Sequence, residues 1–233
     1  MSTYVLVHGA WHGGQCWERV VPLLAEAGHR VFAPSLTGLG DKVHLRGPEV
    51  NLDTHVDDIV SLLTEQDLTD VILVGHSYAG LVITSAADRV PERVGRLVYL
   101  DAMVPEDGES ALDVQPMTRA LIERAAETEP GWLVPPMPEM PPMGLFGVTD
   151  PADAAWLREM LTDQPVGCFV QPVRLTDPAL RLIPRTHIHC VAGVPEGIER
   201  RPVPASAQVW ELPTGHDCMI TMPAELTELL LKL

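Results

Sequence analysis

The sequence predicts a doubly wound α/β fold built on a mainly parallel sheet. Through the first hundred residues, short apolar segments rich in β-branched side chains alternate with amphipathic segments of helical period. Glycine and proline mark the changes from one kind of segment to the other. Short apolar strands joined by helices imply right-handed crossovers and a sheet covered on both faces. A chain of 233 residues fits one domain of ordinary size, so we expect a single domain over residues 1–233.

Six segments are predicted as strands because they are short, apolar and bounded by turn residues. They are Tyr4–Val7, His29–Ala33, Val71–Val74, Arg96–Leu100, Thr186–Val191 and Gln208–Leu212. Four segments between or after them have apolar residues at helical spacing. They are Cys16–Ala27, which ends at the natural cap Gly28, and Asp53–Glu65, Tyr78–Arg89 and Ala224–Lys232. The glycine-rich, charged segment Ser35–Asn51 is expected to be a loop.

The pattern changes between about residues 103 and 184, where prolines and methionines accumulate. Proline removes backbone donors, so this insertion is not expected to add strands to the main sheet. Helical pieces are predicted at Ser110–Glu127 and Pro151–Leu161. The insertion contains too many large apolar side chains for a disordered linker. We therefore expect a small helical lid over the carboxyl edge of the sheet.

Charge and cysteine usage exclude several classes of partner and location. The formal net charge is −16, which argues against nucleic acid and anionic membranes as partners. The four cysteines have no ligand-like spacing and are expected to be reduced and mostly buried. No segment has the pattern of a signal peptide or the length of a membrane span. The expected location is the cytoplasm, and the expected partner is a small molecule; a homodimer is left open.

The strongest chemical signal is the run Val71-Ile72-Leu73-Val74-Gly75-His76-Ser77-Tyr78-Ala79-Gly80. An apolar strand stops at Gly75, and a serine two residues later precedes a helix. This is the layout of a nucleophile elbow, the sharp turn that exposes a serine hydroxyl above a parallel sheet. The usual pattern is G-x-S-x-G, and here Ala79 stands at the last position with Gly80 after it. Ser77 is therefore the candidate nucleophile.

A serine nucleophile needs a base and donors for an oxyanion. His216 lies in a loop after the last strand and before the last helix, where a base is expected in this chain order. The predicted oxyanion donors are the backbone N–H groups of Tyr78 and of Ala10, in the loop after the first strand. His8 and His12 have the spacing of a metal pair, but the glycines around them forbid the helix that such ligation needs. We expect no metal ion and no cofactor.

Together these segments resemble the α/β-hydrolase superfamily. The resemblance rests on His8-Gly9-Ala10-Trp11-His12-Gly13-Gly14, Gly75-His76-Ser77, Val98-Tyr99-Leu100-Asp101-Ala102 and Gly215-His216. It is closest to the plant methylesterase and hydroxynitrile lyase branch and to related small bacterial esterases. The resemblance covers nearly the whole chain and is weakest between Met103 and Thr186. It implies a six-stranded core without two extra N-terminal strands.

Two positions separate the esterases from the lyases of this branch. The lyases resemble one another in carrying threonine where this chain has Gly9, and lysine where it has Asp217. The lysine helps to stabilise a cyanide leaving group, and a carboxylate there would do the opposite. Ester hydrolysis therefore fits better than cyanohydrin cleavage.

The acid of the expected triad is missing from its usual place. The family places it after the fifth strand in a C-x-x-D arrangement, but this chain reads Cys190-Val191-Ala192-Gly193. Without an acid, the imidazole can lose its productive tautomer. Asp101, at the end of the fourth strand, is the candidate acid. Glu196 or Glu199, or no functional acid at all, remain as alternatives, and Asp101 could instead simply cap a turn.

The remaining predictions concern the substrate. Gly9, Trp11 and Trp132, together with Tyr78 and the lid methionines, are candidates for lining a substrate pocket, with plain packing of the lid as the alternative for the large side chains. His187 and His189 share one face of a strand and are expected to be hydrogen-bonded core residues. The favoured function is a serine carboxylesterase acting on a small apolar or aromatic ester. The alternatives are a natural-product tailoring enzyme (thioesterase, cyclase or lyase) or a non-catalytic small-molecule-binding relative.

Overall fold

The structure is a computed structural model that describes residues 1–116, 118–127, 129–192 and 200–233. Its centre is a sheet of six strands in the order β2-β1-β3-β4-β7-β8, and every neighbouring pair is parallel. The strands are β1 (Thr3–Val7), β2 (Arg30–Phe32), β3 (Val71–His76), β4 (Val94–Leu100), β7 (Arg185–Cys190) and β8 (Gln208–Leu212). All six lie where the sequence predicted strands, so the α/β-hydrolase fold is confirmed.

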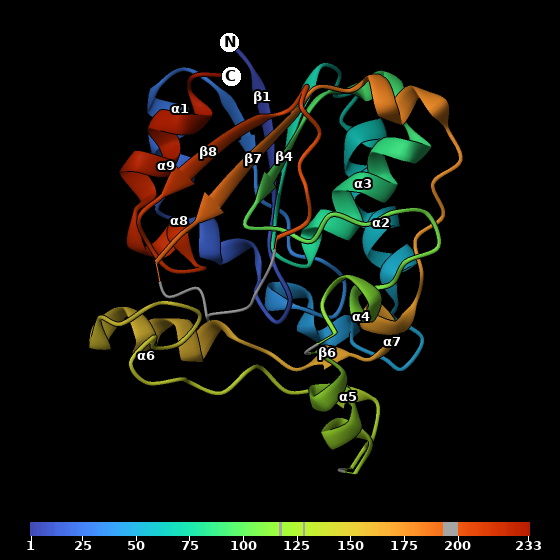
Figure 1. Cartoon of the computed structure of the whole chain (residues 1–233), viewed down its shortest axis with the longest axis vertical. Coiled ribbons are helices and arrows are strands. Elements are labelled where there is room, and N and C mark those ends of the chain that lie inside the picture. Colours follow the sequence, from blue (N-terminus) through green and yellow to red (C-terminus); the bar gives the residue numbers. More distant parts are fainter. Residues whose placement is uncertain (117, 128, 193–199) are drawn as a thin grey trace.

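Helices cover both faces of this sheet (Figure 1). On one face lie α1 (Val21–Glu26), α8 (Cys218–Thr221) and α9 (Pro223–Leu230); on the other lie α2 (Leu52–Glu65) and α3 (Ala79–Arg89). Alternate residues of each strand enter the two cores, so Leu73 packs toward α2 and α3 while Val74 packs toward α1 and α9. Burial on both faces explains why the strands read as continuous apolar runs.

A proline divides one of the predicted helices. The segment predicted as one helix over Cys16–Ala27 forms a 3-10 turn at Gly14–Trp17, and α1 begins only at Val21. Pro22 lacks an N–H and is accepted only in the first turn of a helix. Near the end of the chain, Pro223 opens α9 one residue before the predicted start at Ala224, and the short α8, which was not predicted, precedes it. The helix α2 begins one residue earlier than predicted, where Asn51 and Thr54 form a capping box.

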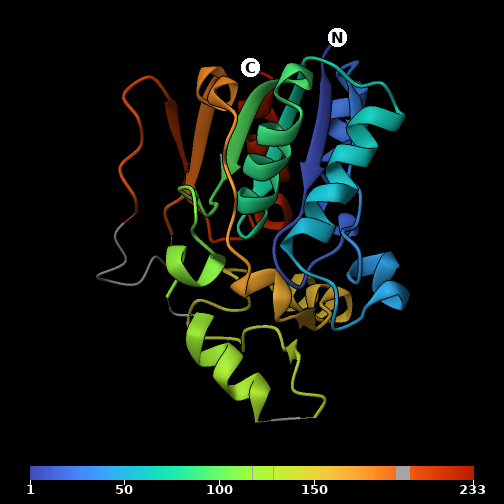
Figure 2. The same ribbon diagram turned by 90° about the vertical axis from the view of Figure 1, so that its right-hand side faces the viewer.

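The insertion forms a lid past the carboxyl ends of the strands, at the opposite end of the molecule from both termini (Figure 1, Figure 2). Its elements are α4 (Ala111–Val114), α5 (Thr118–Ala126), β5 (Leu133–Val134), α6 (Pro151–Met160), β6 (Gln164–Pro165) and α7 (Gly167–Val170). As predicted, it adds no strand to the main sheet among the described residues. It does contain a separate two-stranded antiparallel sheet of β5 and β6, which was not predicted.

The last part of the predicted insertion, from α7 onward, does not belong to the lid. The helix α7 contacts α2, and the 3-10 turn Pro178–Leu182 contacts α3, so this segment runs back along the body of the molecule (Figure 1). The Asp88 carboxylate of α3 holds it by accepting hydrogen bonds from the N–H groups of Thr176 and Asp177 at 3.0 and 2.9 Å. The segment that covers the sheet edge is therefore shorter than residues 103–184.

Two predictions about the whole chain can be compared directly with the structure. All four cysteines are unpaired and buried, which confirms that expectation. Across the described ranges, every helix is too short or too polar to span a bilayer.

Candidate active site

Ser77 occupies a sharp turn between β3 and α3. Its backbone has φ of +55°, in the left-handed region that non-glycine residues seldom adopt. The turn is held by hydrogen bonds from the Ser77 N–H to the Leu100 carbonyl (3.2 Å) and from the Met103 N–H to the Ser77 carbonyl (2.9 Å). These contacts join the end of β3 to the end of β4. Ser77 is thus placed at the carboxyl edge of the sheet, as the elbow motif predicts.

The turn needs glycine at two positions, and they explain the unusual motif. A Cβ on Gly75 would lie 2.8 Å from the Ala79 carbonyl oxygen. A Cβ on Gly80 would lie only 1.8 Å from the Met103 carbonyl oxygen, on the chain that leaves β4. The backbone approach that requires glycine therefore falls at Gly80, while the methyl group of Ala79 is accommodated.

His216 and Asp101 are hydrogen-bonded to each other. The Nδ1–H of His216 donates to Oδ2 of Asp101 at 2.7 Å. Asp101 directly follows β4 and has φ of +43°, and His216 lies in the loop between β8 and α8. With its proton held on Nδ1, neutral His216 presents the lone pair of Nε2. Ser77, His216 and Asp101 all line one cavity.

The second oxygen of Asp101 also has partners. Its Oδ1 accepts a hydrogen bond from Nη2 of Arg200 at 2.7 Å and from the Cys190 N–H at 3.2 Å. The same Arg200 nitrogen donates to the Cys190 carbonyl at 2.6 Å. The segment between β7 and β8 therefore contributes a cation to the candidate acid Asp101. Gly193, Glu196 and Glu199 lie outside the described residues.

These contacts shift the protonation of both groups. Burial raises the pKa of Asp101, but the hydrogen bond and charge of His216 and the charge of Arg200 outweigh it and leave the pKa below its ordinary value. Burial lowers the pKa of His216, but the hydrogen bond and charge of Asp101, with the charge of Asp217, leave the pKa above 6.5. Asp101 is thus ionised and supports a protonated His216.

The two predicted oxyanion donors are free to bind a ligand. Among the described residues, neither the Ala10 N–H nor the Tyr78 N–H donates to a protein acceptor. The Tyr78 side chain points away from the cavity, and its hydroxyl donates to Nδ1 of the buried His55 at 3.0 Å. His55 is fixed in turn by its Nε2–H, which donates to the Thr37 carbonyl at 3.0 Å.

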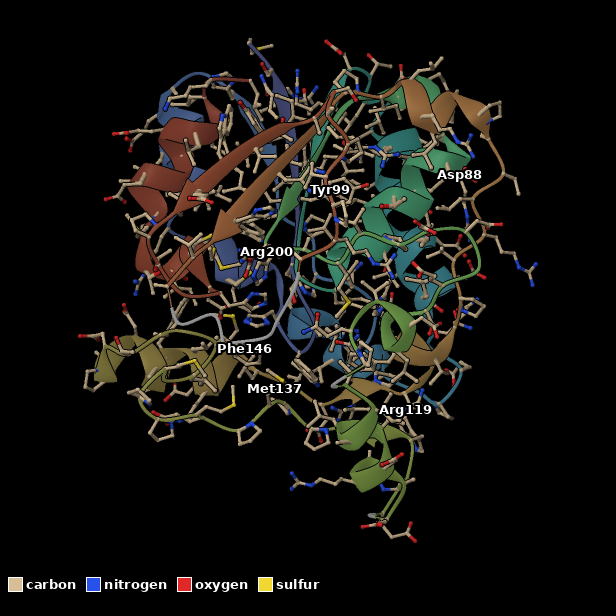
Figure 3. All side chains as sticks on the ribbon, in the orientation of Figure 1. Asp88, Tyr99, Arg119, Met137, Phe146 and Arg200 are labelled. Carbon is tan, nitrogen blue, oxygen red and sulfur yellow. The ribbon has the colours of Figure 1, made fainter. Side chains whose placement is uncertain are left out.

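The cavity has a volume of about 730 Å³ and lies between the strand ends and the lid. Figure 3 shows Phe146 and Met137 below the sheet on the lid side and Arg200 beside the end of β7. The lid contributes mainly apolar walls, through Val114, Met137, Met140, Met143 and Phe146. Of the three predicted substrate-lining residues, Trp11 lines the cavity, but Trp132 and Gly9 do not. The carbonyl of Trp132 instead accepts a hydrogen bond from the Val166 N–H, within the lid.

Trp11 joins the lid to the oxyanion loop. Its backbone N–H donates to Oε1 of Gln164 at 2.8 Å, and its indole N–H donates to the Val134 carbonyl at 2.9 Å. Its carbonyl accepts from the Thr162 N–H. Because a single residue bonds to three lid residues in two segments, the lid position and the oxyanion loop are linked.

Backbone strain gathers around this cavity. Six non-glycine residues among those described have positive φ, and Trp11, Ser77, Asp101 and Phe146 line the cavity. Such strain persists only where surrounding contacts impose it, and it is common at functional sites. Nothing in the local sequence identifies Trp11, Asp101 or Phe146 as strained.

The site also contains a lid residue, Phe146, that was not predicted. The Phe146 ring lies 5.8 Å from Trp11 and 6.4 Å from His216 between ring centroids, and its carbonyl accepts from the Asp217 N–H. The only sequence signal for this contact is the glycine beside it. A Cβ on Gly147 would lie 2.5 Å from Cα of Gly215, so the lid approaches the base loop closely there.

The prediction for His187 and His189 was wrong in part. Both line the cavity, and the buried Nε2 of His187 has no hydrogen-bond partner among the described residues. The His187 ring stacks on Tyr99 at 4.9 Å. Burial, followed by the charges of His189 and Arg185, lowers the pKa of His187 to about 4, so this ring is neutral at ordinary pH.

At Gly9, one of the two positions expected to separate esterases from lyases, contacts within the structure favour a glycine. A Cβ on Gly9 would lie 2.9 Å from Nδ1 of His76 and 3.0 Å from Cβ of Ser77, so His76 occupies the space that a threonine would need. Asp217 is fully buried, hydrogen-bonded to His12 and absent from the cavity lining. Its side chain therefore does not face a leaving group, and among these two positions only Gly9 borders the nucleophile Ser77.

One group of side chains has metal-ligand chemistry. Ligand atoms of His76, His216 and Asp217 lie within 4.8 Å of one another. Nε2 of His76 donates to the His216 carbonyl at 3.0 Å, and Nδ1 of His216 is engaged by Asp101. Both nitrogens are therefore already hydrogen-bonded within the protein. The expectation of no metal ion stays a prediction.

Comparison with known proteins agrees with this fold. Residues 4–229 match the alpha/beta hydrolase family, and the chain belongs to that family. A carbendazim hydrolyzing esterase from Nocardioides is 37% identical over the full length of both chains. Methylesterase 1 of Arabidopsis thaliana is 37% identical over 105 residues, which is 44% of this chain and 40% of that protein.

Among solved structures, an extracellular alpha/beta-hydrolase from a Paenibacillus species has a TM-score of 0.85 and 25% identity. The match covers 100% of this chain and 98% of that one. That protein is described as sharing structural and functional homology with tobacco salicylic acid binding protein 2. The predicted resemblance to the methylesterase branch and to small bacterial esterases is thus confirmed.

Proposed function

We propose that this protein is a serine carboxylesterase that cleaves a mainly apolar ester through an acyl-enzyme. One observation carries the proposal: the 2.7 Å hydrogen bond between His216 and Asp101, in the same cavity as the elbow serine Ser77. Nucleophile, base and acid come from three different loops at one sheet edge. The full-length relative that is named an esterase supports the same reaction class.

In the proposed mechanism, Nε2 of His216 takes the proton from Oγ of Ser77 as that oxygen attacks the ester carbonyl carbon. Asp101 holds the Nδ1 proton of His216 and stabilises the imidazolium that forms. The imidazolium then gives its proton to the leaving alcohol, and the acyl-enzyme remains on Ser77. A water molecule repeats the sequence, with its proton passing through His216 back to Ser77 as the acid departs.

The negative charge of each tetrahedral intermediate would be bound by the N–H groups of Ala10 and Tyr78. Their freedom from protein acceptors supports this role. Donors held in place before the reaction need no reorganisation as charge develops, which makes them effective in a closed site.

The cavity favours an apolar substrate larger than a simple acetate. Its volume of about 730 Å³ and its walls of Met137, Met143, Phe146 and Phe169 suit an aromatic or branched group. Arg200 and Arg201 also line it, but Asp101 and Glu109 respectively occupy them with ion pairs. We therefore do not expect an anionic substrate.

A substrate panel tests the function. Purified protein would be assayed with p-nitrophenyl esters of increasing acyl length, aromatic methyl esters, thioesters and carbendazim, the compound named for the full-length relative. We expect turnover of the apolar esters, with a preference for acyl groups larger than acetyl. A wild-type protein that hydrolyses none of these compounds yet binds apolar ligands would instead support a non-catalytic relative.

The pH dependence of kcat/KM should report His216. The base must be neutral to accept a proton, and its raised pKa places the acid limb at higher pH than for an ordinary histidine, so activity falls as the pH drops through that raised pKa. Arg200 is a cation that lowers the pKa of His216, whereas Asp101 and Asp217 raise it. Arg200→Gln is therefore expected to move the acid limb to higher pH, and Arg200→Lys to leave it nearly unchanged. Profiles of p-nitrophenyl ester hydrolysis between about pH 5 and 9 would measure both, and an unmoved limb in Arg200→Gln would contradict the assignment.

The predicted cytoplasmic location and the open question of a homodimer stay as stated from the sequence. The expectation that the partner is a small molecule is part of the proposal above.

A further inference from the structure

A buried pair of side chains connects the oxyanion loop to the base loop. Nε2 of His12 lies 2.9 Å from Oδ2 of Asp217, and the two side chains are 1% and 0% exposed. His12 follows Ala10 in the loop after β1, and Asp217 follows His216 in the loop after β8. The two residues are 205 positions apart in the chain. Neither has a role in the mechanism proposed above.

The hydrogen bonds of His12 show that the pair is electrically neutral as a unit. Nδ1 of His12 lies 2.6 Å from the Ala10 carbonyl oxygen, which can only accept. Nδ1 must therefore donate, and Nε2 faces a carboxylate oxygen, so one further proton lies between Nε2 and Asp217. The total charge of the pair is zero in either case, and the carboxylate charge of Asp217 that acts on His216 corresponds to the proton on Nε2 of His12.

Stability alone gives a weak reason for such a pair. Buried ion pairs can often be replaced by apolar side chains without loss of stability, whereas removing one partner is costly. The pair is also incompletely satisfied: Oδ1 of Asp217 has no hydrogen-bond partner among the described residues and lies 3.7 Å from Nε2 of His76. A buried oxygen left without a partner costs free energy, so an apolar pair would serve packing as well or better.

The two residues lie where their contact can fix the distance between the loops that follow β1 and β8. The strands β1 and β8 are separated in the sheet by β3, β4 and β7, so no strand pairing sets the distance between their loops. His76, at the end of β3, lies between them, with ring centroids 6.0 Å from His12 and 4.5 Å from His216. The pair thus reaches across the site: His12 bonds to the Ala10 carbonyl, and its partner Asp217 directly follows the base His216.

We propose that His12 and Asp217 are positioning residues, which hold the Ala10 oxyanion donor at the correct distance from the base His216. This inference rests on the proposed serine esterase function. Removing the pair would let the two loops move apart, so that the donor no longer meets the oxyanion that forms when His216 activates Ser77. A misplacement of this kind weakens transition-state binding more than substrate binding.

The test is a double-mutant cycle with His12→Phe, Asp217→Leu and the double variant. Each single variant leaves one polar partner buried and should lower the melting temperature, and the double variant should recover it. We expect kcat of the double variant to stay roughly 10- to 100-fold below wild type with KM nearly unchanged. The rate of reaction with a fluorophosphonate should fall in parallel, because phosphonylation uses the same donor and base.

A matched control removes an ion pair outside the cavity lining, Lys42 with Asp58, as Lys42→Met with Asp58→Leu. Its kcat should equal that of wild type. A stable double variant of His12 and Asp217 with wild-type kcat would overturn the positioning role and leave the esterase proposal intact. A double variant that stays destabilised and loses kcat only in proportion to its folded fraction would also overturn it. An inert wild-type protein would overturn the esterase proposal, and the positioning role with it.

Discussion

Ser77→Ala is expected to lower kcat for an activated ester by roughly 10⁶-fold and to abolish covalent labelling by a fluorophosphonate. The expectation follows from the mechanism, in which Oγ of Ser77 forms the bond to the acyl group. Neither the oxyanion donors nor His216 can replace that atom, so only the weak catalysis of a bound water would remain.

Labelling followed by intact-protein mass spectrometry would measure the first effect, and ester hydrolysis the second. Ser85→Ala is a suitable control, because Ser85 lies in the same helix α3, is buried, and has an Oγ without a hydrogen-bond partner among the described residues. It should be labelled and should turn over substrate like wild type. Stoichiometric labelling of Ser77→Ala would show that another residue is the nucleophile.

Asp101→Asn is expected to lower kcat by roughly 10⁴-fold, with KM little changed. The asparagine amide can still lie against Nδ1 of His216, but it can donate a hydrogen bond there and thereby favour the wrong tautomer of the imidazole. It also loses the charge that stabilises the imidazolium and that pairs with Arg200. The change should therefore act on the chemical step.

This prediction also decides between the acids that the sequence left open. Glu196→Gln and Glu199→Gln should have nearly wild-type kcat if Asp101 is the acid. Asp107→Asn is a control for surface aspartates of the same region, since Asp107 is exposed, outside the cavity lining, and accepts from the Leu175 N–H. Wild-type activity in Asp101→Asn together with a large loss in a glutamate variant would assign the acid to the loop after β7.

Much of the fold and part of the site follow from local patterns in the chain. The six strands were predictable because a parallel sheet covered on both faces requires continuous apolar runs. The elbow at Gly75-His76-Ser77 and the base at His216 were predictable because each lies at a strand end marked by glycine. One error has a local cause as well: Pro22 lies in the first turn of α1, which therefore begins later than the apolar period suggests.

What the sequence by itself determined is thus the class of fold, the candidate nucleophile, the candidate base and the oxyanion loop. Only the tertiary structure decided which carboxylate meets His216, because that depends on β4 and β7 being neighbours in the sheet. The same holds for Arg200 on Asp101, for Phe146 beside the base loop and for His12 on Asp217. These contacts join residues that are distant in the chain, and no local periodicity records them. They arise because parallel strands bring all their carboxyl ends to one edge, where loops far apart in sequence meet.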